Sequence, residues 1–406
     1  MKQAGKFYSL NVLLLSLLVI PVTSCEAGTP FNRQFPERVV LNVTADPTHS
    51  MAVNWRTAQL VAEPAVQLAL AIDAPQLESN VIQIKAEVTP LQIKGDSGVF
   101  QYAAIMTGLQ PKTIYAYRVG NAKHWSEWSQ FKTAAEQAEP FRFLYVGDPQ
   151  FDITAYVSRI FRAAYAAAPD AAFLLCPGDI VNDGDDDDLW GEIFYAAGWI
   201  PKMVPFVPTV GNHEYKSNPK RLTPLYRPQF NLPLNGPCGV AESAYYFDYQ
   251  GVRVVMLNSN ELIHEQARWL DSLLALNPQR WTILAMHHPL YPIASNRDYT
   301  DLRNAFLPVI ERHNVDLVLA GHDHAYARSY KLRGGQRVTD NQPGTYYFVS
   351  VCGPKQYKLE SKFLDLYAKT ATNHQMYQVV TVSRAQLQVQ TFSVTGRLVD
   401  EIVLRK

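Results

Sequence analysis

The stretch CPGDIVND, residues 176–183, ends an apolar run and opens into a loop, and the other chemically distinctive stretches of the chain resemble it. Its Asp179 is a carboxylate that can bridge two metal ions through its two oxygens. The comparable stretches are GDPQ at 147–150, GNHE at 211–214, MHHP at 286–289 and GHDH at 321–324. Each follows an apolar run and opens into a loop, so we expect all five to converge on one site.

From Phe141 onward, short apolar strands alternate with helices. The pattern predicts helices over 155–168, 265–276 and 301–313. It predicts strands over 142–146, 171–175, 204–210, 252–257, 282–286, 317–320 and 346–351, and an alternating region at 377–404 that closes the sheet with a hairpin or two. Buried strands that alternate with helices indicate an α/β layered domain, which we place at residues 140–406.

The preceding part of the chain has a different pattern. Short alternating runs at 39–43, 51–55, 66–70, 102–105 and 114–119 are separated by turn residues and predict strands. Their spacing is typical of a small β-sandwich, which we place at residues 37–134. The small and polar residues 134–140 predict a linker between the two domains.

Composition and charge narrow the possible partners. The chain has 406 residues, 47% of them hydrophobic and 18% charged, which suits a globular protein of two domains. Its formal net charge is zero and it has no basic stripe, so nothing in the sequence favours nucleic acid as a partner.

The first residues have the pattern of a signal peptide. Lys2 and Lys6 precede an apolar run over 10–20 that is too short for a transmembrane helix. The run is followed by small residues and Cys25, which resembles the lipobox of bacterial lipoproteins. We therefore expect residues 1–24 to be removed and Cys25 to carry a lipid, giving an exported, membrane-anchored protein of the cell envelope, periplasmic or at the cell surface. The alternative is an ordinary secretory peptide with an incidental cysteine.

The number of cysteines limits the disulfides that the chain can form. Without Cys25, the mature chain keeps Cys176, Cys238 and Cys352, so it can form at most one disulfide. Cys176 lies in an apolar strand pattern and is expected to be a buried thiol, whereas pairing of Cys238 with Cys352 stays open.

The acidic run at 183–188 lacks the glutamate that closes a calcium loop, so we interpret it as a solvated loop before a helix at Leu189.

The five loops together present carboxylate, amide and imidazole side chains. Such mixed oxygen and nitrogen donors suit metals such as Mn, Fe, Zn or Mg. A single Gly-Asn-His-Glu is usually a turn, and a single buried histidine is usually a core residue. Five such loops in succession, each after an apolar strand, predict a metal centre.

This series resembles the calcineurin-like metallophosphoesterases, and GHDHAYAR at 321–328 is similar to the purple acid phosphatase branch. LQP at 109–111 and WSEWS at 125–129 resemble the end of a fibronectin type III module. YYFD at 245–248, QARWL at 266–270 and Trp281 are also similar to that branch. The resemblance covers residues 37–406 and implies a four-layer β-sandwich flanked by helices, preceded by an all-β sandwich.

The resemblance also implies a binuclear site that hydrolyses phosphomonoesters through a metal-bridging hydroxide. His213, directly after the metal-binding asparagine, would donate a proton to the leaving group; the alternative is that it only orients Asn212. The first metal ion would be bound by Asp148, Asp179 and His324, and the second by Asp179, Asn212, His287 and His322.

Three positions depart from the family pattern. Purple acid phosphatases have a tyrosine where this chain has Asn182, so we expect a protein that is not purple, with metals of undetermined identity. Other metallophosphoesterases have a histidine where this chain has Gln150, whose amide oxygen is a candidate metal ligand. Where some purple acid phosphatases have further histidines, this chain has Arg297, which is a candidate phosphate ligand or an ordinary surface arginine.

Two further residues have open roles. His288 is expected either to support the metal ligands or to belong to the core. Asn182 or Asp183 is an alternative candidate to support His213 by a hydrogen bond.

The leading hypothesis is a phosphomonoesterase acting on a small phosphate ester. A phosphodiesterase with the same site is the first alternative; a monoester dianion needs extra positive or donor groups, and a diester needs room for a second substituent. The second alternative is a surface binding protein in which the metal domain is an inert scaffold. Against it, no expected ligand has been replaced by an apolar residue.

Overall fold

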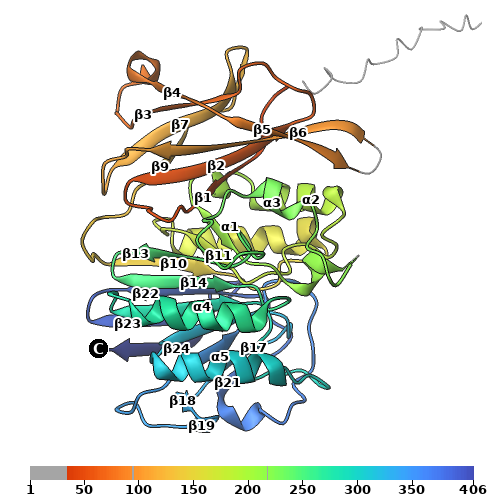
Figure 1. The fold of residues 1–406 in the computed structure, drawn as a ribbon, viewed down its shortest axis with the longest axis vertical. Helices are drawn as coiled ribbons and strands as arrows, with labels where there is room; N and C mark the ends of the chain where they lie inside the picture. Colours follow the sequence, from red (N-terminus) through yellow and green to blue (C-terminus); the bar gives the residue numbers. More distant parts are fainter. Residues whose placement is uncertain (1–33, 94–95, 217) are drawn as a thin grey trace, which may run out of the picture. The chain divides into compact units, whose positions relative to one another are not determined.

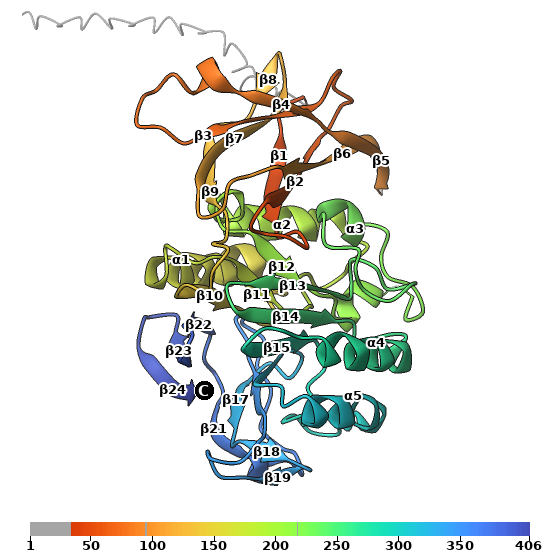
Figure 2. The ribbon, with the colours of Figure 1, turned by 60° about the vertical axis from the view of Figure 1, so that its left-hand side comes forward.

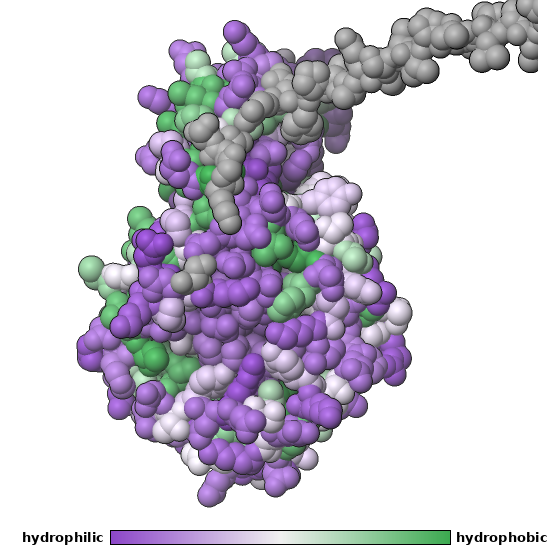
Figure 3. Space-filling view, turned by 90° about the vertical axis from the view of Figure 1, so that its right-hand side faces the viewer, coloured by the Kyte–Doolittle hydropathy of each residue, from purple (hydrophilic) through white to green (hydrophobic). Residues whose placement is uncertain are grey.

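The computed structural model describes residues 34–93, 96–216 and 218–406. The predicted signal peptide at 1–24 and the lipidation site Cys25 lie outside the described residues. Within these ranges no helix has both the length and the hydropathy needed to cross a membrane. On the face shown in Figure 3, hydrophilic side chains predominate and hydrophobic residues form small separate groups.

The N-terminal domain is an antiparallel β-sandwich. Its core contains the aromatic side chains of Trp55, Tyr102 and Tyr117, all fully buried. The five predicted strands are present, and the strands that the sequence did not reveal are short or mostly exposed, which weakens the alternation. One sheet has the order β1 (Glu37–Asn42), β2 (Ser50–Thr57), β6 (Asp96–Thr107), β5 (Glu87–Ile93), and the other β4 (Ile82–Lys85), β3 (Ala65–Leu70), β7 (Ile114–Asn121), β8 (His124–Trp125), with β9 (Ser129–Lys132) also paired to β7.

The C-terminal domain contains two mixed sheets. The first has the order β12 (Phe206–Pro208), β11 (Leu174–Cys176), β10 (Phe141–Tyr145), β22 (Met376–Val382), β23 (Gln386–Ser393), β24 (Leu398–Arg405). The second has the order β13 (Tyr245–Tyr249), β14 (Val252–Leu257), β15 (Trp281–Met286), β16 (Leu317–Ala320), β20 (Tyr346–Val349), β17 (Tyr326–Ser329), β21 (Tyr367–Ala371). β18 (Leu332–Arg333) and β19 (Gln336–Arg337) form a separate small hairpin. The closing region that we expected at 377–404 is the antiparallel meander β22–β24.

Helices cover the outer faces of these two sheets. α4 (Ile263–Ala275) and α5 (Thr300–Arg312) pack on the second sheet, and α1 (Ser158–Ala167) and α2 (Asp187–Ala197) pack on the first (Figures 1 and 2). The largest hydrophobic cluster fills the space between the sheets and continues beneath α1 and α2. The predicted four-layer arrangement preceded by an all-β sandwich is confirmed.

The two domains are joined by buried polar contacts at the start of α2. The Asp187 carboxylate pairs with Arg38 at 2.8 Å and with Arg56 at 2.7 Å, and these three side chains are only 9–11% exposed. Our interpretation of the acidic run as solvated is therefore wrong for Asp187, although Asp185 and Asp188 are exposed. The helix begins at residue 187, two residues before Leu189, because Asp186 caps it by accepting a hydrogen bond from the Asp188 N–H.

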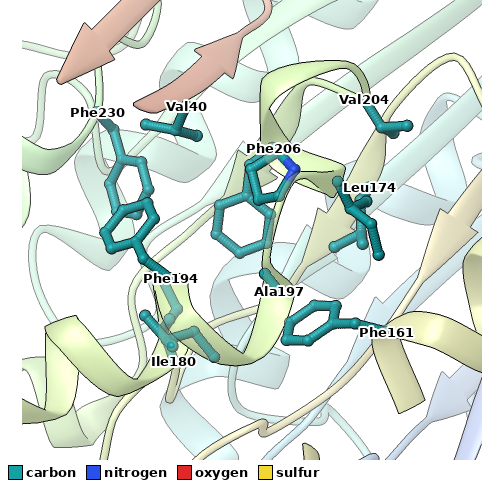
Figure 4. A pocket seen from close by; sticks show the side chains of 12 residues that line it. Val40, Phe161, Leu174, Ile180, Phe194, Ala197, Val204, Phe206 and Phe230 are labelled. Carbon is teal, nitrogen blue, oxygen red and sulfur yellow. The ribbon is translucent and has the colours of Figure 1, made fainter. Parts of the chain in front are cut away.

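An apolar pocket lies at the same junction (Figure 4). Val40 of β1, Phe161 of α1 and Phe194 of α2 line it, together with Phe206 and Phe230. The described residues that line this pocket are all apolar, so it is part of the hydrophobic core.

The three described cysteines are free thiols. Cys176 is buried, as expected. Cys352 is also buried whereas Cys238 is exposed, so the disulfide that the sequence left open is not formed in this structure.

Candidate metal centre

The five predicted loops meet where the carboxyl ends of parallel strands from both sheets come together. Asp148 follows β10, Asp179 follows β11 and Asn212 follows β12, and these three strands are parallel. His287 follows β15, and the GHDH loop follows the neighbouring parallel strand β16. Carboxyl ends of parallel strands are where α/β sheets place their binding sites, which explains why the loops converge.

Three lone-pair groups surround one imidazole nitrogen, that of His287, at the centre of the cluster. His287 Nε2 lies 3.2 Å from Asp179 Oδ2, 3.2 Å from Asn212 Oδ1 and 2.9 Å from His322 Nδ1. A single N–H can satisfy only one of these neighbours at good geometry. A cation at this point would satisfy all of them.

The second half of the cluster contains Asp148, Gln150 and His324. His324 Nε2 lies 3.9 Å from Asp148 Oδ1, and Gln150 Nε2 lies 2.8 Å from Asp179 Oδ2 and 3.2 Å from His324 Nε2. Ligand atoms of Asp148, Asp179 and His287 all fall within 4.8 Å of one another. All seven predicted metal ligands are thus brought together, with Asp179 between the two halves.

The residues present fit the two metal ions that the sequence implies. Within the described part of the chain, the buried Gln150 Oε1 atom of this cluster has no hydrogen-bond partner. A half-turn of the Gln150 amide would exchange its two head atoms and aim Oε1 at Asp179 and His324, where it would serve a cation. The donor set of carboxylates, amides and imidazoles is of the kind that binds Mn, Fe, Zn or Mg.

The ligands are held on strained backbone. Asp148, Asp179, His322 and His324 adopt positive φ angles of 48°, 49°, 72° and 43°. A non-glycine residue in this left-handed region costs on the order of 1 kcal/mol or more, and such residues cluster at functional sites.

Glycines let the neighbouring loops approach these ligands. A Cβ at Gly211 would lie 2.1 Å from Asp179 Oδ1, and a Cβ at Gly321 would lie 2.2 Å from Asp148 Oδ2. The glycine that precedes each of these ligand motifs therefore makes room for a carboxylate of another loop.

Glu214 is the last residue of the GNHE motif, and the sequence analysis assigned it no role. Its buried carboxylate accepts hydrogen bonds from the N–H groups of Asp179, Ile180 and Gly211 at 3.0, 2.9 and 2.7 Å. It thus ties the Asp179 loop to the Asn212 loop. The signal that could have revealed it is its position three residues after Gly211, which is the spacing of a helix-capping glutamate.

His213 lies at the edge of the cluster and is half-buried. Its Nδ1 lies 2.6 Å from the backbone oxygen of Asn182, and its Nε2 lies 3.9 Å from Asp179 Oδ2. The support that we expected from Asn182 or Asp183 is supplied by the main chain of Asn182. Because Nδ1 donates to that carbonyl, Nε2 is the nitrogen that faces the cluster.

Tyr299 and Ser259 hold the distal sides of two histidines. The Tyr299 hydroxyl lies 2.5 Å from His322 Nε2, and Ser259 Oγ lies 2.8 Å from His288 Nδ1. The His288 ring also packs against the ring of His322 at 4.4 Å between centroids. His288 is therefore a support for the metal ligands, which was one of its two expected roles. Neither Tyr299 nor Ser259 belongs to a motif, so no sequence pattern could have identified them.

Arg297 is engaged by the GHDH loop. Its Nη1 donates to the backbone oxygen of His322 at 2.8 Å and forms an ion pair with Asp323. Asp323 is fully buried and also accepts from the N–H groups of Ile293 and Ala294. These contacts give Arg297 a positioning role; binding of a substrate phosphate by this residue stays a prediction.

Protonation in the cluster follows burial and the paired charges. Burial and the charge of Asp179 raise the pKa of Asp148. Burial lowers the pKa of His287, but Asp179 and Asp148 raise it more, to about 9. Burial and the positive charge of Lys355 lower the pKa of His324 to about 3, which leaves a neutral imidazole. Metal binding must therefore displace a proton from His287, while His324 is already in the form that a metal ion needs.

Comparisons with known proteins agree with this geometry. Residues 141–326 match the calcineurin-like phosphoesterase family, and residues 36–133 match the purple acid phosphatase N-terminal domain. An uncharacterized protein of Mycobacterium tuberculosis is 27% identical over 332 residues, covering 72% of this chain and 62% of that protein. Purple acid phosphatase 21 of Arabidopsis thaliana is 30% identical over 232 residues, covering 54% of this chain and 51% of that protein. The chain thus spans between half and two thirds of the length of these relatives.

A solved structure shows the same fold. The purple acid phosphatase PPD1 from yellow lupin seeds superposes with a TM-score of 0.78 at 16% identity, covering 92% of this chain and 74% of that chain. This likeness concerns the fold. By the family comparisons, residues 141–326 form a domain similar to the calcineurin-like phosphoesterases, and it follows a domain similar to the N-terminal domain of purple acid phosphatases, in agreement with the resemblance noted in the sequence.

Proposed function

We propose that this chain is a binuclear metal-dependent phosphoesterase that hydrolyses phosphomonoesters. The observation that carries the proposal is the convergence of Asp179, Asn212, His287 and His322 on one point, where only a cation satisfies all four groups. The family of residues 141–326 and the names of the similar phosphatases support the same reaction class.

The chain's own residues divide the work. Asp148, Gln150 and His324 would hold one metal ion, and Asn212, His287 and His322 the other, with Asp179 shared. Bound metal ions would supply Lewis-acid polarisation of phosphoryl oxygens and a water of lowered pKa. His213, with its Nδ1–H donating to the Asn182 carbonyl, presents Nε2 to the cluster; in the imidazolium form Nε2 carries a proton that it can give to the oxygen of the leaving group.

Hydrolysis of a chromogenic phosphomonoester and the matching phosphodiester tests the proposal. The full chain is reconstituted separately with Mn, Zn, Fe or Mg, and bound metal is measured by elemental analysis. Asp179→Asn is expected to lose metal and turnover together, whereas the exposed neighbour Asp185→Asn should retain both. Preference for the diester would favour the phosphodiesterase alternative. Two bound ions with no turnover of either ester would favour a binding protein.

A second variant isolates the role of His213. His213→Ala should keep both metal ions and lose turnover, because its imidazole is not among the expected ligands. His264→Ala, at an exposed position on α4, is the matched control and should retain both. Equal metal loss in the Asp179 and His213 variants would show that the role assigned to His213 is wrong.

We also propose, from the sequence pattern of residues 1–25, that the protein is exported and anchored through a lipid on Cys25. Metabolic labelling with a radioactive fatty acid should mark the full chain in the membrane fraction. Cys25→Ser should abolish the label and release the protein. A labelled Cys25→Ser variant, or an unlabelled wild type, would contradict the anchor.

A further inference from the structure

Lys355 lies beside the candidate metal centre on an aromatic support. Its Nζ is 4.4 Å from the centroid of the Phe151 ring and 5.1 Å from that of Tyr357. Its backbone oxygen is 3.2 Å from His324 Nδ1. The residue therefore contacts a predicted metal ligand through its main chain while two rings hold its ammonium group.

The two rings connect this ammonium to the reacting side of the site. The Phe151 ring lies 5.9 Å from the ring of His213 and 6.1 Å from that of His324, measured between centroids. The Tyr357 ring lies 4.9 Å from the His324 ring. Phe151 directly follows Gln150 and adopts a positive φ of 69°, which turns the chain at this point. Phe151, His213, Lys355 and Tyr357 are all half-buried, so a ligand from solvent can reach them.

The neighbouring cations are neutralised, but Lys355 is not. Arg297 is paired with Asp323, and Lys216 lies 3.7 Å from Asp183. Within the described ranges, no carboxylate forms an ion pair with Lys355. A cation held only by aromatic faces is bound weakly and keeps its hydrogen-bond donors available for an anion.

We propose that Lys355 is a substrate-binding residue that donates a charge-assisted hydrogen bond to the phosphoryl group of a phosphomonoester dianion. The proposal rests on the proposed function and deepens it by naming the group that selects the substrate class. A phosphomonoester carries a charge of about −1.5 to −2 at neutral pH, and a diester carries one negative charge. A free ammonium at the site therefore favours the monoester, and Phe151 with Tyr357 sets where that ammonium lies.

Three variants of the full chain test the assignment. Lys355→Met removes the charge and keeps the aliphatic stem and the main-chain contact to His324. Lys355→Arg restores a cation, and Lys358→Met removes an exposed lysine three residues further along as the matched control. All three are loaded with metal, their metal content is measured, and kcat/KM is determined for a matched aryl phosphomonoester and diester. The affinity for inorganic phosphate is measured by calorimetry on the same samples.

Lys355→Met should lower kcat/KM for the monoester about 10- to 100-fold, the range expected for loss of one charged hydrogen bond. The diester value should change less than about threefold, and phosphate affinity should fall about tenfold or more. Lys355→Arg should recover most of the loss, and Lys358→Met should behave as wild type.

The assignment would be overturned if Lys355→Met lowered kcat/KM equally for the monoester and the diester, or left the affinity for phosphate unchanged. It would also be overturned if Lys355→Arg recovered no activity, or if Lys355→Met lost metal, which would indicate a structural role through His324. A wild-type chain that hydrolyses neither ester would refute the proposed function alone. In that case the phosphate titration still decides the role of Lys355, because equal affinities of wild type and Lys355→Met would refute it.

Discussion

Adding one methyl group at Gly321 is expected to weaken metal binding and turnover without replacing any ligand. A Cβ at this position would lie 2.2 Å from Asp148 Oδ2, whereas real Cβ contacts essentially never fall below 3.0 Å. Gly321 does not adopt a positive φ, so alanine brings no backbone strain of its own. The substitution therefore acts by displacing the Asp148 carboxylate.

The size of that displacement sets the expected effect. The Asp148 oxygen must move by about 0.8 Å, and misplacement on the order of 1 Å typically costs about 100-fold in activity. Metal sites tolerate deviations of only about 0.2 Å in ligand distance, so the bound metal should fall as well. The shift also disturbs the two hydrogen bonds of 2.8 Å that Asp148 accepts from the His322 N–H, which moves a second ligand loop.

The assay combines elemental analysis of bound metal, turnover of the phosphomonoester and thermal unfolding of the metal-free chain. Gly321→Ala should bind fewer metal ions and lose about 100-fold in kcat/KM. Gly98→Ala is the matched control, because its Cβ would meet only Phe100 at an ordinary 3.7 Å in the N-terminal sandwich. Two ions bound with wild-type affinity and wild-type turnover in Gly321→Ala would refute the close approach of Gly321 to Asp148.

Three further predictions concern stability. Asp187→Ala should lower the free energy of unfolding, measured in urea, by about 3 kcal/mol, because it leaves the nearly buried Arg38 without its carboxylate partner. Asp188→Ala, at an exposed neighbouring position, should change that free energy little, and equal effects of the two substitutions would refute a domain junction held by the Asp187–Arg38 ion pair. Burial raises the pKa of Glu242 from 4.5 to about 7, so the free energy of unfolding of the wild type falls as the pH rises from about 4.5 to 7. The free energy of unfolding of Glu242→Gln, relative to that of the wild type, should therefore rise by up to roughly 3 kcal/mol between pH 4 and 8, and a pH-independent difference would contradict the shift. Glu214→Gln should cost about 1–3 kcal/mol in the metal-free chain, because an amide cannot accept backbone hydrogen bonds at both of its head atoms; an unchanged urea midpoint would show that these bonds do not hold the loops.

The sequence predicts the fold where apolar strands are long and buried. The strand expected at 317–320 has the observed bounds of β16, and 252–257 those of β14, because both are buried along their whole length. The edge strands β4 and β5 escaped prediction because most of their residues are exposed and carry little alternation. The ion pairs of Asp187 escaped it because they join residues more than 130 positions apart, and no local pattern records such a contact.

The candidate site likewise contains residues that the sequence predicts and residues that only the structure identifies. The ligands could be named because each stands in a short motif directly after a strand, where chemistry and position coincide. Tyr299 and Lys355 stand in no motif, and only the folded chain shows that each contacts a histidine of the ligand cluster, Tyr299 through its hydroxyl and Lys355 through its backbone oxygen. For Arg297 the residue type alone suggested a phosphate ligand, whereas the structure shows its guanidinium in an ion pair with Asp323.

Three buried carboxylates organise the ligand loops, and each does so by accepting main-chain N–H groups. Glu214 joins the Asp179 loop to the Asn212 loop, Asp148 receives the His322 N–H, and Asp323 receives two N–H groups of the segment that follows His287. Backbone that is strained at four ligands persists only when the surrounding structure fixes it, and these bonds supply that restraint. Two of the three carboxylates are not expected metal ligands, so the geometry of the centre depends on residues that the metal ions need never touch. Asp148 combines both functions, and for this reason its displacement by a methyl group at Gly321 is expected to be more damaging than loss of a peripheral ligand.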